Sequence, residues 1–207
     1  MKRKSIEKMM KRTPSSIVQT TKRGSTPIYL AAVNGHLDIV KYLAGLTKNP
    51  NASNQNEITP IHKAANGGYL EIVKFLANCT DAPNSKSDNG ITPIHNAAGK
   101  GHLEIVKFLA DLTDTPNSKC NDGVTPIHNA ACKGHLEIVK FLADLTENPN
   151  AADNHGKTPI DYAKESNYVE IVKFLESVVS SPQPPPCPQP RSSFYGTFHK
   201  FFSKSHP

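Results

Sequence analysis

Histidine recurs along this chain at a fixed interval, and imidazole is a common zinc ligand, so metal binding is the first chemistry to consider. Two sets of equivalent positions carry it: His62, His95 and His128, and then His36, His102 and His135. If the interval reflects stacked helices, each about 10 Å across, equivalent side chains lie too far apart to share one ion, because zinc–ligand bonds are about 2 Å long. We interpret these histidines as structural, bonding to a turn or to threonine hydroxyls, and we expect no metal.

Carboxylates repeat in the same way, each three residues before a lysine, at Glu71, Glu104, Glu137 and Glu170. Catalysis needs different groups gathered at one point. One acidic position copied from unit to unit beside its own lysine is instead typical of a solvent-facing helix edge. We therefore expect no enzyme activity, no cofactor and no small-molecule substrate.

The elements that carry these side chains are set by a period of 33 residues. Thr-Pro-Ile occurs at Thr26, Thr59, Thr92, Thr125 and Thr158. A fixed period of this length is the signature of stacked repeats, in which each unit covers an apolar face of its neighbour. The predicted units are 26–58, 59–91, 92–124, 125–157 and a shorter unit at 158–180.

Each unit predicts two helices and a turn, as the third unit illustrates. Thr92 suits a helix N-cap and Pro93 the first helical position. Gly101 ends that helix by accepting a left-handed conformation. A second helix is predicted over 103–112, apolar around most of its circumference and therefore buried on more than one side. The dipeptide Asp122-Gly123 then supplies a tight turn into the next unit.

These units resemble the ankyrin repeat. The matching features are TPIH at Thr59, Thr92 and Thr125, the alanine pairs 64/65, 97/98 and 130/131, and Gly-His at 35, 101 and 134. The resemblance covers about three quarters of the chain. It implies an all-α fold, an ankyrin-type solenoid of helix-turn-helix repeats with short β-hairpin turns. It also implies a non-enzymatic protein–protein interaction scaffold or adaptor whose partner is a protein.

Composition divides the chain into three parts. Residues 1–24 form a basic arm of net charge +7, expected to be disordered; the array at 25–180 is acidic at −4; and 181–207 form a Pro-rich linker and tail at +3. An acidic array is poorly suited to nucleic acid, because that binding depends on matching many phosphates. The basic arm alone leaves open a nuclear or nucleic-acid-associated factor.

Cysteine usage and hydropathy predict the compartment. The four cysteines have no CxxC spacing, which indicates reduced thiols, and Cys79 replaces a leucine found at Leu46, Leu112 and Leu145, so we interpret it as core filler. No apolar run approaches the roughly 20 residues of a membrane span, and the first residues lack the apolar core of a secretion signal. We expect an intracellular protein, cytoplasmic or nuclear, neither secreted nor membrane-spanning.

The copies differ from one another mainly at the turn tips and at the end of the first helix. Free variation beside a fixed scaffold is what functional loops show, and these are the positions where the ankyrin family usually contacts partners. We call this set the variable surface. Its members are Gln55, Asn56, Asn66, Asp88, Asn89, Ile91, Lys100, Asn121, Asp122, Val124, Lys133, His155 and Lys157.

The tail concentrates five of the chain's 14 aromatic residues among basic ones. A short helix there would place Phe194, Phe198, Phe201 and Phe202 on one face. An aromatic face rimmed by positive charge suits an anionic membrane surface or a partner's groove. A membrane-associated adaptor anchored by its basic and aromatic ends therefore remains an alternative to the plain scaffold, as does a tail that folds back on the array.

Overall fold

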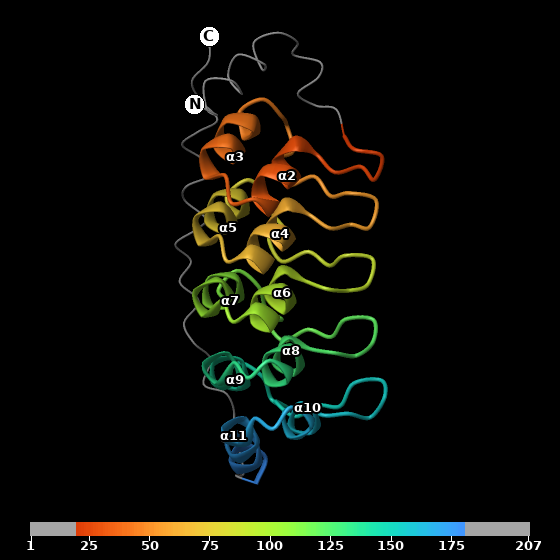
Figure 1. Ribbon diagram of the computed structural model, residues 1–207, viewed down its shortest axis with the longest axis vertical. Helices are drawn as coiled ribbons and strands as arrows, with labels where there is room; N and C mark the ends of the chain where they lie inside the picture. Colours follow the sequence, from red (N-terminus) through yellow and green to blue (C-terminus); the bar gives the residue numbers. More distant parts are fainter. Residues whose placement is uncertain (1–19, 181–207) are drawn as a thin grey trace.

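The computed structural model describes residues 20–180 as a stack of helix pairs (Figure 1). The first helices of the five units lie in one row: α2 (Pro27–Val33), α4 (Pro60–Gly67), α6 (Pro93–Lys100), α8 (Pro126–Cys132) and α10 (Pro159–Glu165). The second helices lie in a parallel row: α3 (Leu37–Ala44), α5 (Leu70–Ala77), α7 (Leu103–Ala110), α9 (Leu136–Ala143) and α11 (Val169–Ser180). The predicted all-α solenoid is confirmed.

Local sequence sets where each first helix begins and ends. In the third unit the Thr92 hydroxyl accepts a bond from the backbone N–H of His95, and proline holds the first helical position. Gly101 ends the helix at φ +80°, a conformation that costs glycine little. In the last unit Asn167 takes this place at φ +59°, because asparagine tolerates the left-handed region better than most residues.

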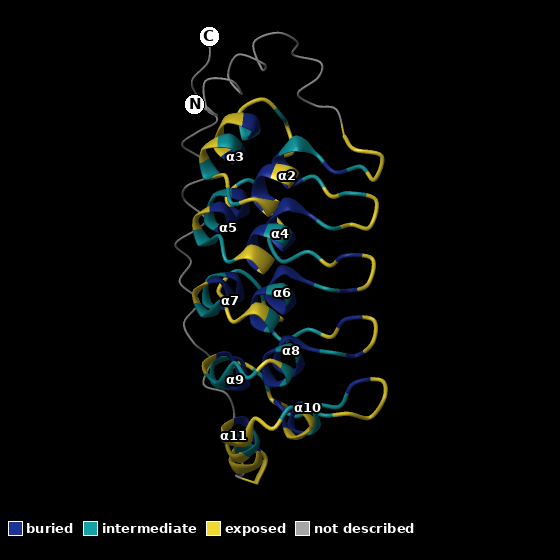
Figure 2. Ribbon diagram, in the orientation of Figure 1, coloured by how far each residue is buried: buried dark blue, intermediate teal, exposed yellow. Residues whose placement is uncertain are grey.

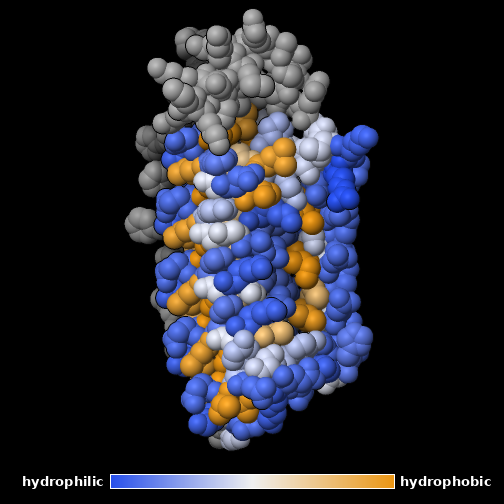
Figure 3. Space-filling model, in the orientation of Figure 1, coloured by the Kyte–Doolittle hydropathy of each residue, from blue (hydrophilic) through white to orange (hydrophobic). Residues whose placement is uncertain are grey.

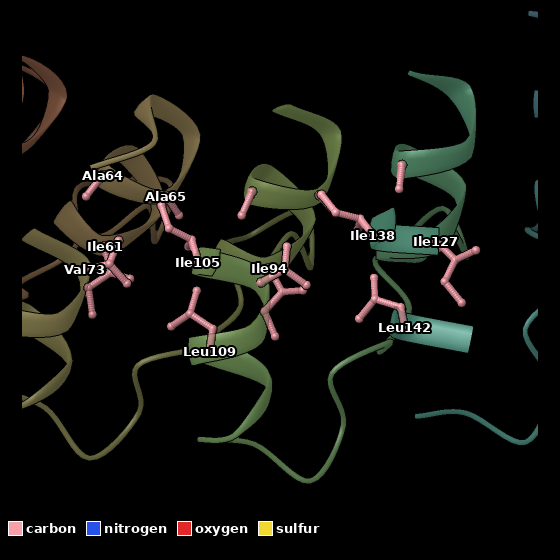
Figure 4. Close-up of a cluster of buried hydrophobic side chains, with 14 of the residues drawn as sticks. Ile61, Ala64, Ala65, Val73, Ile94, Ile105, Leu109, Ile127, Ile138 and Leu142 are labelled. Atoms are coloured by element: carbon pink, nitrogen blue, oxygen red, sulfur yellow. The ribbon is translucent and has the colours of Figure 1, made fainter. Parts of the chain in front are cut away.

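The core runs continuously between units because each helix packs on the equivalent helix of its neighbour. Ile61, Ile94 and Ile127 from the first row are fully buried, as are Leu109 and Leu142 from the second. Figure 4 shows side chains of both rows filling the space between successive units. The helix pairs in substantial contact belong to the same or adjacent units, so the described array is stabilised by nearest-neighbour contacts.

The units are joined by turns that project to one side of the stack (Figure 1). In the third of them the N–H of Cys120 donates to Val124 O at 2.9 Å and that of Gly123 to Cys120 O at 3.0 Å. Within residues 20–180 no strand accompanies these turns. The expected β-hairpins are therefore present as hairpin-like turns without regular strands.

The structured part begins before residue 25, the predicted start of the array. Thr21 N–H donates to Ser25 O, and Gln55 N–H of the next turn donates to Arg23 O at 3.2 Å. The last residues assigned to the arm thus form the turn of the first unit. The remainder of the arm, residues 1–19, and the linker and tail, residues 181–207, lie outside the described residues.

The second helices α3, α5, α7 and α9 end earlier than expected, which changes the interpretation of Cys79. Helix α7 stops at Ala110, two residues short of the predicted end, so the column of Cys79 falls in the following turn. Leu46 and Leu145 in that column are exposed and Cys79 is only half-buried. The prediction that Cys79 fills the core is wrong, because its position lies beyond the last buried turn of the helix.

Candidate functional site

The buried histidine column is a set of structural bonds, as predicted. His95 Nδ1 accepts from the Thr92 N–H at 3.1 Å, and Nε2 donates to Val124 O at 3.1 Å. His62 and His128 repeat both contacts in their own units. Burial lowers the pKa of His62 and of His95 to about 4, and it lowers the pKa of His128 as well. Each ring is therefore held neutral, bridging a helix start to the next turn.

The second histidine column does not converge on a common point either. His102 Nε2 donates to Asn66 O of the preceding unit at 3.3 Å, whereas His36 lies exposed. Among residues 20–180 no three His, Cys, Asp or Glu side chains come together in a way that would hold a metal ion.

The repeated carboxylates form ion pairs with the lysines three residues later. Glu104 Oε1 lies 3.2 Å from Lys107 Nζ, and the equivalent pairs of the second, fourth and fifth units span 3.1, 2.9 and 3.3 Å. All are largely exposed, so each contributes at most about 1 kcal/mol. This row, which we call the outer edge, gives the array a solvated face on its second helices.

The variable surface follows the turn tips and the adjoining ends of the first helices. Figure 2 shows exposed residues at successive tips. Eleven of its thirteen members are exposed, while Ile91 and Val124 are half-buried at the base of their turns. The backbone carbonyls of these two accept the bonds from His62 and His95. They therefore hold the turns in place as well as lining the surface.

Hydrogen bonds from one turn to the next fix the relative positions of the tips. The N–H of Asp88 donates to Asn56 O, that of Asn121 to Asn89 O, and that of Asn154 to Asp122 O, at 3.0 to 3.1 Å. The Asn121 side chain adds a bond to Asp88 O at 2.8 Å. The tips form a ladder that is already ordered without a partner.

Charges on the variable surface are arranged differently along its length. Lys100 and Lys133 occupy equivalent exposed positions in the two central units, and neither forms an ion pair within residues 20–180. Lys157 in the last turn instead contacts Glu165 on α10 at 2.6 Å. Lys100 and Lys133, in the third and fourth units, thus present two cations to solvent, whereas Lys157 is neutralised by Glu165 of the last unit.

Comparison with known proteins agrees with this geometry. The family model described as ankyrin repeats (3 copies) matches residues 4–87, 29–119 and 112–179. The chain belongs to the ankyrin-repeat family. Ankyrin repeats are generally protein–protein interaction modules. A search of the curated proteins finds no match to the chain.

Two structural features of this ankyrin array escaped the sequence reasoning. The asparagines that close the units, Asn51, Asn84, Asn117 and Asn150, each accept a bond from a backbone N–H ten residues later, at 3.1 to 3.2 Å. In the turn that precedes the last unit, Asp153 accepts from Tyr162 Oη at 2.8 Å and from the N–H groups of His155 and Lys157. The regular recurrence of the asparagines was the available signal for the first feature. For Asp153 the available signal was Asn54, three periods earlier, whose Oδ1 accepts the equivalent bonds from Asn56 and Ile58 N–H, although serine and cysteine stand between them in the column.

The predicted tail-docking residues, Phe194, Phe198, Phe201 and Phe202, lie outside the described residues. The basic arm of the nucleic-acid alternative also lies outside them, apart from its last few residues. Within residues 20–180 no helix combines the length and the apolar character needed to cross a membrane.

Proposed function

We propose that this ankyrin array is a non-enzymatic scaffold or adaptor that binds a protein partner along the variable surface. The observation that carries the proposal is the combination of exposure and variation: the units agree at buried columns and differ at the exposed tips. A partner that spans several turns contacts a different side chain in each unit, while the scaffold beneath these turns repeats unchanged.

The turn-to-turn hydrogen bonds support this proposal energetically. Association costs free energy for every loop or side chain that becomes ordered. The backbone bonds between successive tips, together with that from Asn121 to Asp88, order the turns in advance. Little ordering of the turn backbone is left to occur on binding, so this part of the cost of association is small.

The two central lysines suggest the chemistry of the partner. Lys100 and Lys133 lie exposed one unit apart, with no ion pair in the described array. We expect the partner to place carboxylates or other acceptors opposite them, because complementary charge steers encounter and sets register.

The test is affinity purification with the full chain and two charge-matched variants. Lys100→Glu with Lys133→Glu changes the variable surface, and Lys74→Glu with Lys107→Glu makes the same net change on the outer edge. We expect partners to be captured by the parent and by the outer-edge variant, and to bind the first variant about tenfold or more weakly. Capture that survives the first change and is lost with the second would show that the outer edge is the binding face.

A further inference from the structure

The first unit leaves apolar side chains uncovered at the open end of the array. Leu30 is 47% exposed, Val33 41% and Tyr42 51%. A hollow of about 160 Å³ opens at the same end, with Ile28 and Leu43 in its lining. Hydrophobic surface is visible over α2 and α3 at this end in Figure 3. We call this surface the end face.

Internal units show what the same positions do when a preceding unit is present. Asn96, one period after Lys63 and two after Leu30, donates to His62 O of the unit before it at 3.4 Å. Phe75, one period after Tyr42, lies with its ring centroid 6.0 Å from Lys41 Nζ of the unit before it. Leu30 and Tyr42 therefore occupy columns that contact a preceding unit.

Burial gives the same result for both helices of the first unit. Ile72 is 1% exposed, whereas Ile39, its equivalent in α3, is only partly buried. Pro60 and Thr59 are buried, whereas their equivalents one unit earlier are half-buried. Within residues 20–180 the end face is thus an inter-unit surface that no preceding unit covers.

The sequence just before it has the residues to supply that side. Residues 4–11 read KSIEKMMK, one period before LDIVKYLA of α3. Ile6 falls in the column of Ile39, Met10 in that of Leu43, and Lys8 in that of Lys41. The family match also begins at residue 4, well before the first complete unit.

We propose that residues 4–19 fold back on the end face as a half-unit, with a helix over 4–11 that covers the α3 side of this face with Ile6 and Met10. In this register Lys8 reaches Tyr42 as Lys41 reaches Phe75. Glu7 falls in the column of the buried Val40, but a half-unit has no first helix of its own, so a charge there stays in solvent.

The place where the chain reaches the first unit favours residues 4–19, rather than a second copy of the protein, as the cover of the end face. Thr20, the first described residue, itself lines the hollow, so the preceding residues start at the surface that they would cover. An intramolecular contact of this kind benefits from a high effective concentration. The basic arm is then a terminal cap, and its lysines are held beside the first unit.

The test is hydrogen exchange of the full chain in three forms: parent, Ile6→Lys with Met10→Lys, and Glu7→Lys. Both variants add two units of positive charge, but only the first removes apolar side chains from the proposed contact. We expect amides of α3 to exchange about tenfold or more faster in the first variant and at the parental rate in the second. Unchanged exchange in α8 and α9 would show that the rest of the array remains folded.

Equal exchange rates in all three proteins would overturn the proposal. Light scattering adds an independent criterion, since the proposal requires a monomer. A dimer that Leu30→Lys dissociates would show that a second copy covers the end face instead. Neither outcome depends on the variable surface, so failure of this cap and failure of partner binding are distinguishable.

Discussion

Acidification from pH 7 to pH 5 should destabilise the array through His62 and His95. Their pKa values fall from an ordinary 6.5 to about 4 on folding. Between these values the unfolded chain binds more protons than the folded chain, so the free energy of unfolding decreases as the pH falls through this window. From the two pKa values, each histidine lowers the free energy of unfolding by about 2 kcal/mol between pH 7 and pH 5. Together they remove about 4 kcal/mol, and His128 acts in the same direction.

Urea unfolding followed by circular dichroism at the two pH values measures this loss. His95→Gln removes one titrating ring while leaving an amide that can donate to the same carbonyl. We expect the difference in unfolding free energy between pH 7 and pH 5 to shrink by about 2 kcal/mol in this variant. His155→Gln removes an exposed histidine at a turn tip, and it should keep the parental difference.

Two outcomes would contradict the assignment of this pH dependence to the buried histidines. A parent whose stability does not change between the two pH values would mean that the buried rings do not resist protonation. A His95→Gln variant that keeps the full loss would mean that the pH dependence arises elsewhere in the chain.

Three further substitutions separate the forces in the array, each measured by thermal or urea unfolding. A Cβ at Gly101 would lie 2.7 Å from the His135 ring, whereas a Cβ at Gly156, with nearly the same positive φ, would meet nothing within 4 Å. Gly101→Ala should therefore lower the free energy of unfolding by about 1 to 3 kcal/mol more than Gly156→Ala. Equal losses in the two variants would contradict the inter-unit contact. Asn117→Ala removes the acceptor of the part-buried Ile127 N–H and should lower the free energy of unfolding by about 1 to 3 kcal/mol. No loss, and unchanged exchange of that amide, would show that the bond is dispensable. Glu104→Gln breaks an exposed ion pair and should change the free energy of unfolding by less than about 1 kcal/mol. A larger change would mean that the ion pairs of the outer edge contribute to the stability of the array.

Features fixed by neighbouring residues could be predicted from the sequence. The N-cap at Thr92, the first helical position at Pro93 and the left-handed end at Gly101 each depend on backbone preferences within a few residues. The ion pair of Glu104 with Lys107 follows from helical spacing alone. The period of 33 residues then predicted that the units stack, because units with the same apolar positions bury the same faces.

Features fixed by contacts between units were harder to predict. Asn117 reads as a turn residue, yet its Oδ1 accepts from the N–H of Ile127 at the start of the next unit. Cys79 shares a column with leucines but lies beyond the end of α5, so its burial depends on where the helix stops. The early start of the first unit rests on a bond from Gln55 to Arg23 O, which joins two turns far apart in the sequence.

The predicted variable surface combines both kinds of information. Variation between copies identified Asp88, Asn121 and Lys100 without any structure. The hydrogen bonds that order the tips could not be predicted from the sequence, because their acceptors are backbone carbonyls one unit away, and every residue type has such a carbonyl.

Hydrogen exchange of the full chain with and without a captured partner tests the central claim most directly. With a partner bound, we expect slower exchange at the turn tips and first-helix ends of several successive units, and parental exchange in the second helices that carry the outer edge. Slower exchange confined to the outer edge, or to one unit alone, would contradict a partner-binding surface that runs along the array.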